Sequence, residues 1–145
     1  MTKQILFVDD DPQILHSYKL ALEKQYKIMT AESGELALDL LAENSFAVIV
    51  SDMRMPGMDG AQFLSEARKI APDTVRIMLT GYAEVETAIQ AVNSGQIFRF
   101  LTKPCPIKDL VPTLEEAIRQ YSLVTDEQEL LVETLNGSIK IMTEV

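Results

Sequence analysis

Five short apolar runs alternate along the chain with longer segments in which apolar residues recur at helical spacing. The runs have the length of strands and are rich in β-branched and aromatic residues. They comprise residues 5–8, 26–29, 47–50, 75–79 and 97–101. This pattern predicts five β-strands.

Between the runs, apolar residues at intervals of three and four predict helices, and a fifth helix is expected from about Ile107. Asp11-Pro12 and Ser33 are typical helix starts, and Asn93-Ser94-Gly95 is a typical stop. The first and third runs are apolar at nearly every position, as expected when helices cover both faces of a parallel sheet. We therefore expect an α/β domain, a doubly wound five-stranded parallel sheet with five flanking helices.

Composition and charge narrow the function. The chain has 145 residues, with 22 Asp and Glu against 13 Lys and Arg, a net charge of −9 and 47% hydrophobic residues. An acidic protein is a poor nucleic-acid binder, because phosphate contacts need clustered Lys and Arg. We expect no signal segment and no membrane span, since no apolar run is long enough. Cys105 is the only cysteine, which favours a cytoplasmic setting.

Polar side chains follow four of the five apolar runs. They are Asp9-Asp10-Asp11, Ser51-Asp52, Thr80-Gly81 and Thr102-Lys103-Pro104. The carboxyl ends of parallel strands meet at one edge of the sheet, where ligands bind. Carboxylates, a hydroxyl and an ammonium are therefore expected to converge there.

Each of these residues also has a structural interpretation. Asp11 precedes Pro12 and is best interpreted as a helix N-cap. Asp52 could cap a turn, Thr80 could cap the next helix, and Lys103 could be a surface lysine. Their co-occurrence at four strand ends favours a site, and neighbouring carboxylates repel unless a cation lies between them. Oxygen ligands favour Mg²⁺, which commonly binds together with phosphate.

The motifs ILFVDDD, SDMRMPGMDG, LTGYAE and FLTKP occur in this order, and as a set they resemble the receiver domain of two-component response regulators. The resemblance covers about residues 3–121, so we expect a receiver domain over 1–121 with the flavodoxin-like strand order 2-1-3-4-5. It implies a switch that accepts a phosphoryl group from a histidine kinase or phosphotransfer protein. Such a domain is not an enzyme in the usual sense, because it catalyses only its own phosphorylation and dephosphorylation.

The resemblance also implies roles for individual acidic residues. Asp52 matches the aspartate that becomes an aspartyl phosphate. Asp9, Asp10 and Asp52 match ligands of Mg²⁺ or Mn²⁺, with Asp9 acting mainly through water. The main-chain carbonyl of Arg54 matches a further ligand of the ion.

Other roles implied by the resemblance concern the phosphoryl group and its effect. Thr80 and Lys103 match the hydroxyl and the ammonium that bind phosphoryl oxygens, and Lys103-Pro104 matches a cis peptide bond. Thr80 also matches a residue that moves on phosphorylation, and Phe100 an aromatic that rotates into the vacated space. An aromatic on a strand is more often plain core. The switch interpretation predicts an output face on the fourth helix, fifth strand and fifth helix, which is also a candidate homodimer face.

Two further positions bear on the lifetime of the signal. Arg54 and Tyr82 lie two residues beyond Asp52 and Thr80, where side chains flank the route of an attacking water in receivers. A long cation and a bulky phenol at these places predict slow self-dephosphorylation.

Residues 122–145 lie beyond the receiver resemblance. Apolar positions from Tyr121 onward recur at spacings of three, four or seven, which predicts a helix that either pairs with a second copy of the chain or packs on its own domain. Gly137 lowers helix stability by about 1 kcal/mol relative to Ala, so a break near Asn136 is an alternative. The stretch LLVETLNGSIKIMTEV resembles the connector before HD-type phosphohydrolase output domains. We expect a helical linker or extension toward an output domain that these residues do not contain.

Two other function classes stay open. One is a Mg²⁺-dependent aspartyl-phosphate phosphatase, but enzymes of the haloacid dehalogenase type carry Asp-x-Asp after the first strand, whereas Asp52 follows the third run. The other is a receiver-like interaction module that takes no phosphate. The complete set of acidic and basic residues favours the switch over both.

Overall fold

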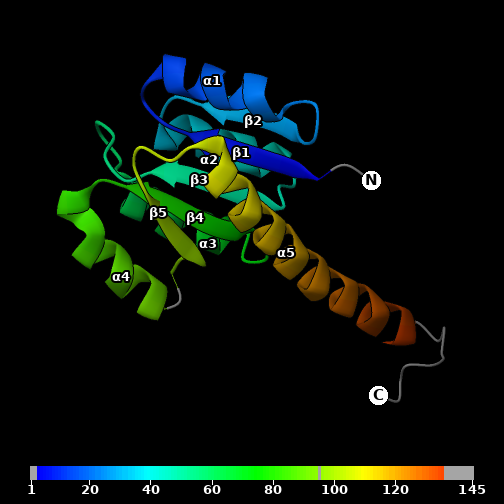
Figure 1. Cartoon of the computed structure of the whole chain (residues 1–145). Coiled ribbons are helices and arrows are strands. Elements are labelled where there is room, and N and C mark those ends of the chain that lie inside the picture. The colour runs from blue at the N-terminus through cyan, green and yellow to red at the C-terminus, as the bar shows by residue number, and fades with distance from the viewer. Residues whose placement is uncertain (1–2, 95, 136–145) are drawn as a thin grey trace.

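Figure 1 shows the computed structural model of the chain, in which helices cover both faces of a central sheet. The structure describes residues 3–94 and 96–135, and the side chains of Tyr82 and of residues 126–135 are not described. The sheet has five strands in the order β2-β1-β3-β4-β5, and each neighbouring pair is parallel. The predicted doubly wound, flavodoxin-like sheet is confirmed.

The strands are β1 (Gln4–Val8), β2 (Lys27–Ala31), β3 (Val48–Asp52), β4 (Val75–Thr80) and β5 (Arg99–Thr102). The helices are α1 (Pro12–Leu22), α2 (Gly34–Glu43), α3 (Gly60–Ile70), α4 (Val85–Asn93) and α5 (Ile107–Leu135), with the 3-10 turn η1 (Tyr82–Glu84) before α4. The predicted strands are all present, and their ends shift by up to two residues. β3 extends past the apolar run because Asp52 still pairs with Leu79 of β4.

Two buried clusters fix the layers of the fold. In β1, Phe7 belongs to a cluster with Leu15 of α1 and Leu114 of α5, whereas Leu6 belongs to one with Phe63 of α3. This alternation follows from the two-residue period of a strand. Each large apolar side chain buried in this way contributes about 1.5–3 kcal/mol. Helices α1 and α5 therefore cover one face of the sheet, and α2, α3 and α4 cover the other.

The predicted helix starts and stops correspond to observed caps. The Asp11 side chain accepts a hydrogen bond from the backbone N–H of Gln13, and Ser33 caps α2 in the same way. Helix α4 ends at Asn93, as expected, but it begins after η1 without a side-chain cap. Thr80 is therefore not a helix cap.

The start of α3 lies close to the end of β3. A Cβ atom on Gly60 would lie 2.2 Å from the main-chain oxygen of Asp52, so only glycine permits this approach. The backbone N–H of Gly60 donates to the carbonyl of Met53 at 2.8 Å. These contacts fix the loop that follows Asp52.

Helix α5 continues as one helix beyond the part that packs on the sheet. Leu110, Leu114 and Ala117 are buried, but the side chain of Leu123 is 62% exposed. The C-terminal half of α5 projects away from the sheet in Figure 1. The predicted break at Asn136 and most of the stretch resembling an HD connector lie outside the described residues, and both remain predictions.

Candidate functional site

Three carboxylates meet at the carboxyl edge of the sheet. Asp9 and Asp10 directly follow β1, and Asp52 is the last residue of β3. Each offers an oxygen, and these three atoms lie within 4.8 Å of one another. Asp9 and Asp52 are buried, with 3% and 5% of their surface exposed, whereas Asp10 is exposed. The convergence predicted from the strand ends is present.

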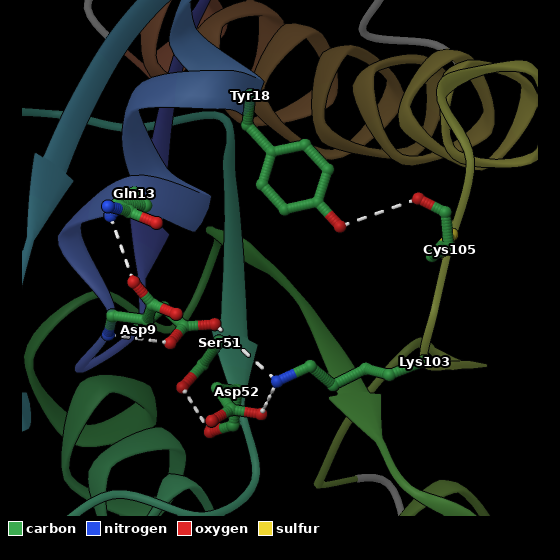
Figure 2. Close-up of polar contacts among 8 residues, drawn as sticks. Asp9, Gln13, Tyr18, Ser51, Asp52, Lys103 and Cys105 are labelled. Carbon is green, nitrogen blue, oxygen red and sulfur yellow. Dashed lines mark hydrogen bonds and ion pairs between the residues drawn. The ribbon is translucent and has the colours of Figure 1, made fainter.

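Lys103 reaches this group from the end of β5 (Figure 2). Its Nζ atom donates to Oδ1 of Asp52 at 2.9 Å and lies 3.6 Å from Oδ2 of Asp9. Burial opposes the charge of Lys103, but the hydrogen bond and the negative charge of Asp52, together with Asp9, raise its pKa above the ordinary value. Lys103 is therefore a fixed ammonium beside Asp52.

Asp9 is the least satisfied member of the group. Its Oδ1 accepts the backbone N–H of Asp11 at 2.9 Å, but its buried Oδ2 has no hydrogen-bond donor within the described part of the chain. Burial raises the pKa of Asp9, and the charges of Asp52 and Asp10 raise it further. A buried oxygen without a donor, next to two other carboxylates, suits a hard divalent cation that prefers oxygen ligands.

Thr80 and the loop after β5 complete this edge. Thr80 is fully buried, and its hydroxyl donates to the carbonyl of Gly81 at 3.2 Å. The backbone N–H of Lys103 donates to the carbonyl of Thr80 at 2.8 Å, which ties the two strand ends together. The Lys103–Pro104 peptide bond is cis. Thr80 and Lys103 are thus held in the same neighbourhood as Asp52.

The other predicted site residues lie around this centre. Phe100 is partly buried against the cluster that contains Ala88 of α4. Helix α4 is part of the predicted output face. Arg54 is exposed in the loop after β3 and pairs with Glu84. The side chain of Tyr82 is outside the described residues, so its role remains a prediction.

Two residues near the site were not predicted. Tyr18 of α1 stacks on Phe7, and its hydroxyl donates to the carbonyl of Cys105 at 3.5 Å (Figure 2). Glu84 binds the guanidinium of Arg54. The helical spacing identifies Tyr18 only as a member of an apolar face, and no motif in the sequence pairs Glu84 with Arg54.

Within the described residues, no helix is long and apolar enough to cross a membrane. The structure contains no second acidic cluster of this kind among the residues it describes.

Comparisons with known proteins agree with this geometry. The chain matches the response regulator receiver domain family over residues 5–115. The transcriptional regulatory protein GlrR of Escherichia coli K12 is 37% identical over 125 residues, which cover 86% of this chain and 28% of GlrR. The chain spans less than a third of the length of such curated relatives.

Solved structures give the same result. A protein of Rhodopirellula baltica described as an adenylate cyclase is 44% identical, with a TM-score of 0.90 over 92% of this chain and 100% of that one. The response regulator TrrA of Thermotoga maritima, solved with Mg²⁺-BeF, is 30% identical, with a TM-score of 0.71 over 80% of this chain and 99% of TrrA. The strand order, the acidic edge and the match over residues 5–115 together show that the chain belongs to the response regulator receiver domain family, whose members are phosphorylation-dependent switches of two-component systems.

Proposed function

We propose that Asp52 accepts a phosphoryl group from a histidine kinase or phosphotransfer protein, and that this changes the surface formed by α4, β5 and α5. One observation carries the proposal. The buried Asp52 carboxylate at the end of β3 is hydrogen-bonded to Lys103 and lies beside Asp9 and Asp10. Positive charge next to a nucleophilic carboxylate is what phosphoryl transfer requires.

The acidic group is the proposed site of Mg²⁺ or Mn²⁺. Asp9, Asp10, Asp52 and the main-chain carbonyl of Arg54 would hold the ion, and the buried Oδ2 of Asp9, which accepts no hydrogen bond from the described residues, supports this assignment. When bound, the ion supplies positive charge to the phosphoryl oxygens. The Mg²⁺-BeF complex of TrrA is consistent with such a site in a relative.

The chain's own residues position the reaction. A carboxylate oxygen of Asp52 attacks phosphorus, and the bond from phosphorus to the donor's nitrogen or oxygen breaks. The leaving group keeps the electron pair: an imidazole nitrogen takes a proton, and acetate leaves as the anion. The Lys103 ammonium and the Thr80 hydroxyl would donate to the phosphoryl oxygens, which carry the charge in a loose transition state. The chain thereby catalyses only its own modification.

The phosphoryl group is lost from Asp52 by hydrolysis. Water attacks phosphorus, the bond to the Asp52 oxygen breaks, and Asp52 leaves with the electron pair. We propose that Arg54 and Tyr82 hinder this water, so that dephosphorylation is slow. Tyr82→Ala should then lose its phosphoryl group faster than the parent, and an unchanged rate would count against the assignment.

Partners and organisation complete the proposal. We assign residues 1–121 to the receiver and 122–145 to a helical linker or extension. GlrR, of which this chain spans 28%, supports a role beside an output domain in a longer protein. The face of α4, β5 and α5, or the end of α5, is the proposed homodimer contact. The half-buried free thiol of Cys105 fits the reducing cytoplasm.

The proposal is tested by intact-mass measurement after incubation with Mg²⁺ and acetyl phosphate. We expect one added phosphoryl group that depends on Mg²⁺ and is absent from Asp52→Asn. Asp39→Asn removes an exposed carboxylate of α2 and should behave like the parent. A phosphoryl group on the Asp52→Asn variant would overturn the proposal. So would a parent chain that takes no phosphoryl group from acetyl phosphate or from a phosphorylated histidine phosphotransfer protein. Repeated turnover of a phosphomonoester would favour the phosphatase instead.

A further inference from the structure

An ion pair joins the two loops that border Asp52 and Thr80. Arg54 lies in the loop after β3, and Glu84 is the last residue of η1 in the loop after β4. The Nε atom of Arg54 donates to Oε2 of Glu84 at 3.0 Å, and Nη2 donates to the same oxygen. The pair therefore spans the carboxyl ends of two neighbouring strands of the sheet.

The two members of the pair are not equally free. The side chain of Arg54 is 78% exposed, whereas that of Glu84 is only 18% exposed. The backbone N–H of Glu84 donates to the carbonyl of Gly81 at 3.0 Å. The hydroxyl of Thr80 donates to that same carbonyl at 3.2 Å. Glu84 is thus the fixed partner, held by the loop that carries Thr80, and it determines where the guanidinium of Arg54 lies.

A phosphoryl group on Asp52 would compete for this guanidinium. Arg54 is two residues from Asp52 in the chain. A phosphoryl group carries between one and two negative charges, and arginine binds phosphate with its planar fork of donors. Arg54 would then stand between two anions, the carboxylate of Glu84 and the phosphoryl group. The partner it prefers sets the positive charge available at Asp52.

We propose that Glu84 is a positioning residue for phosphoryl transfer at Asp52: it binds Arg54 and withholds its guanidinium from the phosphoryl group. The inference rests on the proposed function of Asp52. The proposal adds Glu84 to the residues that act at Asp52, which so far are the acidic group, Thr80 and Lys103. It also makes the loop after β4 part of the control of that reaction.

Glu84→Gln should release the charge of Arg54 toward Asp52. We expect phosphorylation by acetyl phosphate to become about two- to fivefold faster, the range that corresponds to one exposed ion pair. The aspartyl phosphate should also live longer, because a guanidinium placed at the phosphoryl group would further hinder the attacking water, the role proposed for Arg54 above. Both rates are measured by intact mass against time at fixed Mg²⁺ and ionic strength.

A double-mutant cycle separates this role from the charge of Glu84 alone. Glu84→Gln is compared in the parent and in an Arg54→Met background, where no guanidinium can be released. The proposal requires the effect of Glu84→Gln to be much larger when Arg54 is present. Equal effects in the two backgrounds would overturn it, since Glu84 would then act only through its own negative charge.

Two controls exclude a general structural effect. Glu86→Gln removes an exposed carboxylate two residues away in the first turn of α4 and should leave both rates unchanged. The second control uses phosphoramidate as the phosphodonor. Because it carries less negative charge than acetyl phosphate, Glu84→Gln should increase the rate of phosphorylation by phosphoramidate less than the rate by acetyl phosphate. An equal acceleration with both donors would contradict the proposal.

A parent chain that takes no phosphoryl group would refute the proposed function as well, whereas a phosphorylated parent with an additive cycle would refute only the role of Glu84.

Discussion

Asp9 is buried beside two other carboxylates, and its Oδ2 accepts no hydrogen bond from the described residues, although Lys103 Nζ lies 3.6 Å away. Burial raises its pKa above 3.8, with the charges of Asp52 and Asp10 acting in the same direction. When the pKa of a carboxyl is higher in the folded than in the unfolded protein, the protein loses stability as the pH rises from the unfolded-state pKa through the folded-state pKa. At neutral pH the ionised Asp9 therefore destabilises the metal-free protein, which is the expected cost of a prepared cation site.

Asp9→Asn is predicted to stabilise the metal-free protein by about 1 kcal/mol at neutral pH. The amide oxygen can still accept the backbone N–H of Asp11, while the buried charge is gone. The measurement is thermal unfolding with EDTA and again with Mg²⁺. The parent should gain stability from Mg²⁺, and the variant should gain much less. A variant that is less stable than the parent in EDTA would show that Asp9 contributes through its contact with Lys103 instead.

The acidic and basic residues of the site could be predicted from the sequence for a simple physical reason. Asp52, Thr80 and Lys103 end strands or directly follow them, and parallel strands all end at one edge. Glu84 could not be predicted in this way. Its contact with Arg54 depends on the path of η1, a short turn whose geometry leaves no periodic pattern in the sequence.

At the scale of the elements, β5 connects the site to the proposed output face. Lys103 follows this strand directly, and Phe100 lies within it, packed in the cluster that includes Ala88 of α4. The hydroxyl of Thr80 donates to the carbonyl of Gly81. Movement of that hydroxyl toward a phosphoryl group would open space next to β5, which is the basis of the proposed role of Phe100.

Phe100→Ala is predicted to separate phosphorylation from its effect on α4 and β5. Asp52 should still take a phosphoryl group, because Phe100 touches none of the reacting atoms in the proposal. Amide hydrogen exchange should change in α4 and β5 when the parent is phosphorylated, and this difference should be lost in the variant. Phe98→Ala removes an aromatic that packs in the other cluster and serves as the control. An unchanged difference in Phe100→Ala would remove Phe100 from the switch.

A hydrogen bond between Tyr26 and Glu115 connects α5 to the residue that precedes β2. Tyr26 is buried, and its hydroxyl donates to Oε2 of Glu115. Burial, followed by this hydrogen bond and the charge of Glu115, raises the pKa of Tyr26 to about 12. Since the folded-state pKa lies above the unfolded value of 10.0, the stabilisation is present below pH 10 and is lost as the pH rises toward about 12.

Tyr26→Phe is predicted to lower the free energy of unfolding by about 1 kcal/mol at neutral pH. The difference between parent and variant should shrink at about pH 11, where the unfolded parent already gains by ionising its phenol. Urea unfolding at the two pH values measures both effects. Glu115→Gln keeps an acceptor and should cost less than Tyr26→Phe. A constant difference at both pH values would show that the hydroxyl is not the cause.

Element boundaries show how far local pattern extends. The start of α1 follows from Asp11-Pro12, because a cap and a proline at the first turn act through adjacent backbone groups. The end of β3 at Asp52 does not follow from hydrophobicity, since Ser51 and Asp52 are polar and are held in the strand by pairing with β4. Strand ends are set by the neighbouring strand, which a single apolar run does not contain.

At the scale of the whole molecule, α5 belongs to two regions. Its first turns bury Leu110, Leu114 and Ala117 against the sheet, and among its residues with described side chains Tyr121 is the last one packed against that cluster. Beyond this point Leu123 is 62% exposed. The family match ends at residue 115, inside the helix. The same helix therefore packs on the receiver and extends past it, which suits a linker that transmits a change at the face of α4, β5 and α5.

A chain ending at Tyr121 is predicted to fold and to accept a phosphoryl group like the full chain. Among the residues with described side chains, those packed against the buried cluster end at Tyr121, so we expect the unfolding free energy to fall by no more than about 1 kcal/mol, mainly from fraying of the new helix end. Thermal unfolding measures the stability, and intact mass after acetyl phosphate measures the phosphorylation. A shorter chain ending at Asp109 removes Leu110, Leu114 and Ala117 and should not fold.

The full chain and the chain ending at Tyr121 also locate the proposed homodimer contact. Light scattering with and without the phosphoryl group gives the oligomeric state of each. If phosphorylation dimerises both the full chain and the one ending at Tyr121, the contact lies on the face of α4, β5 and α5, which both retain. If only the full chain dimerises, residues 122–145 carry the contact, as the spacing of their apolar positions predicts. A chain ending at Tyr121 that neither folds nor takes a phosphoryl group would contradict the boundary at residue 121, because the extension would then be part of the receiver's own core.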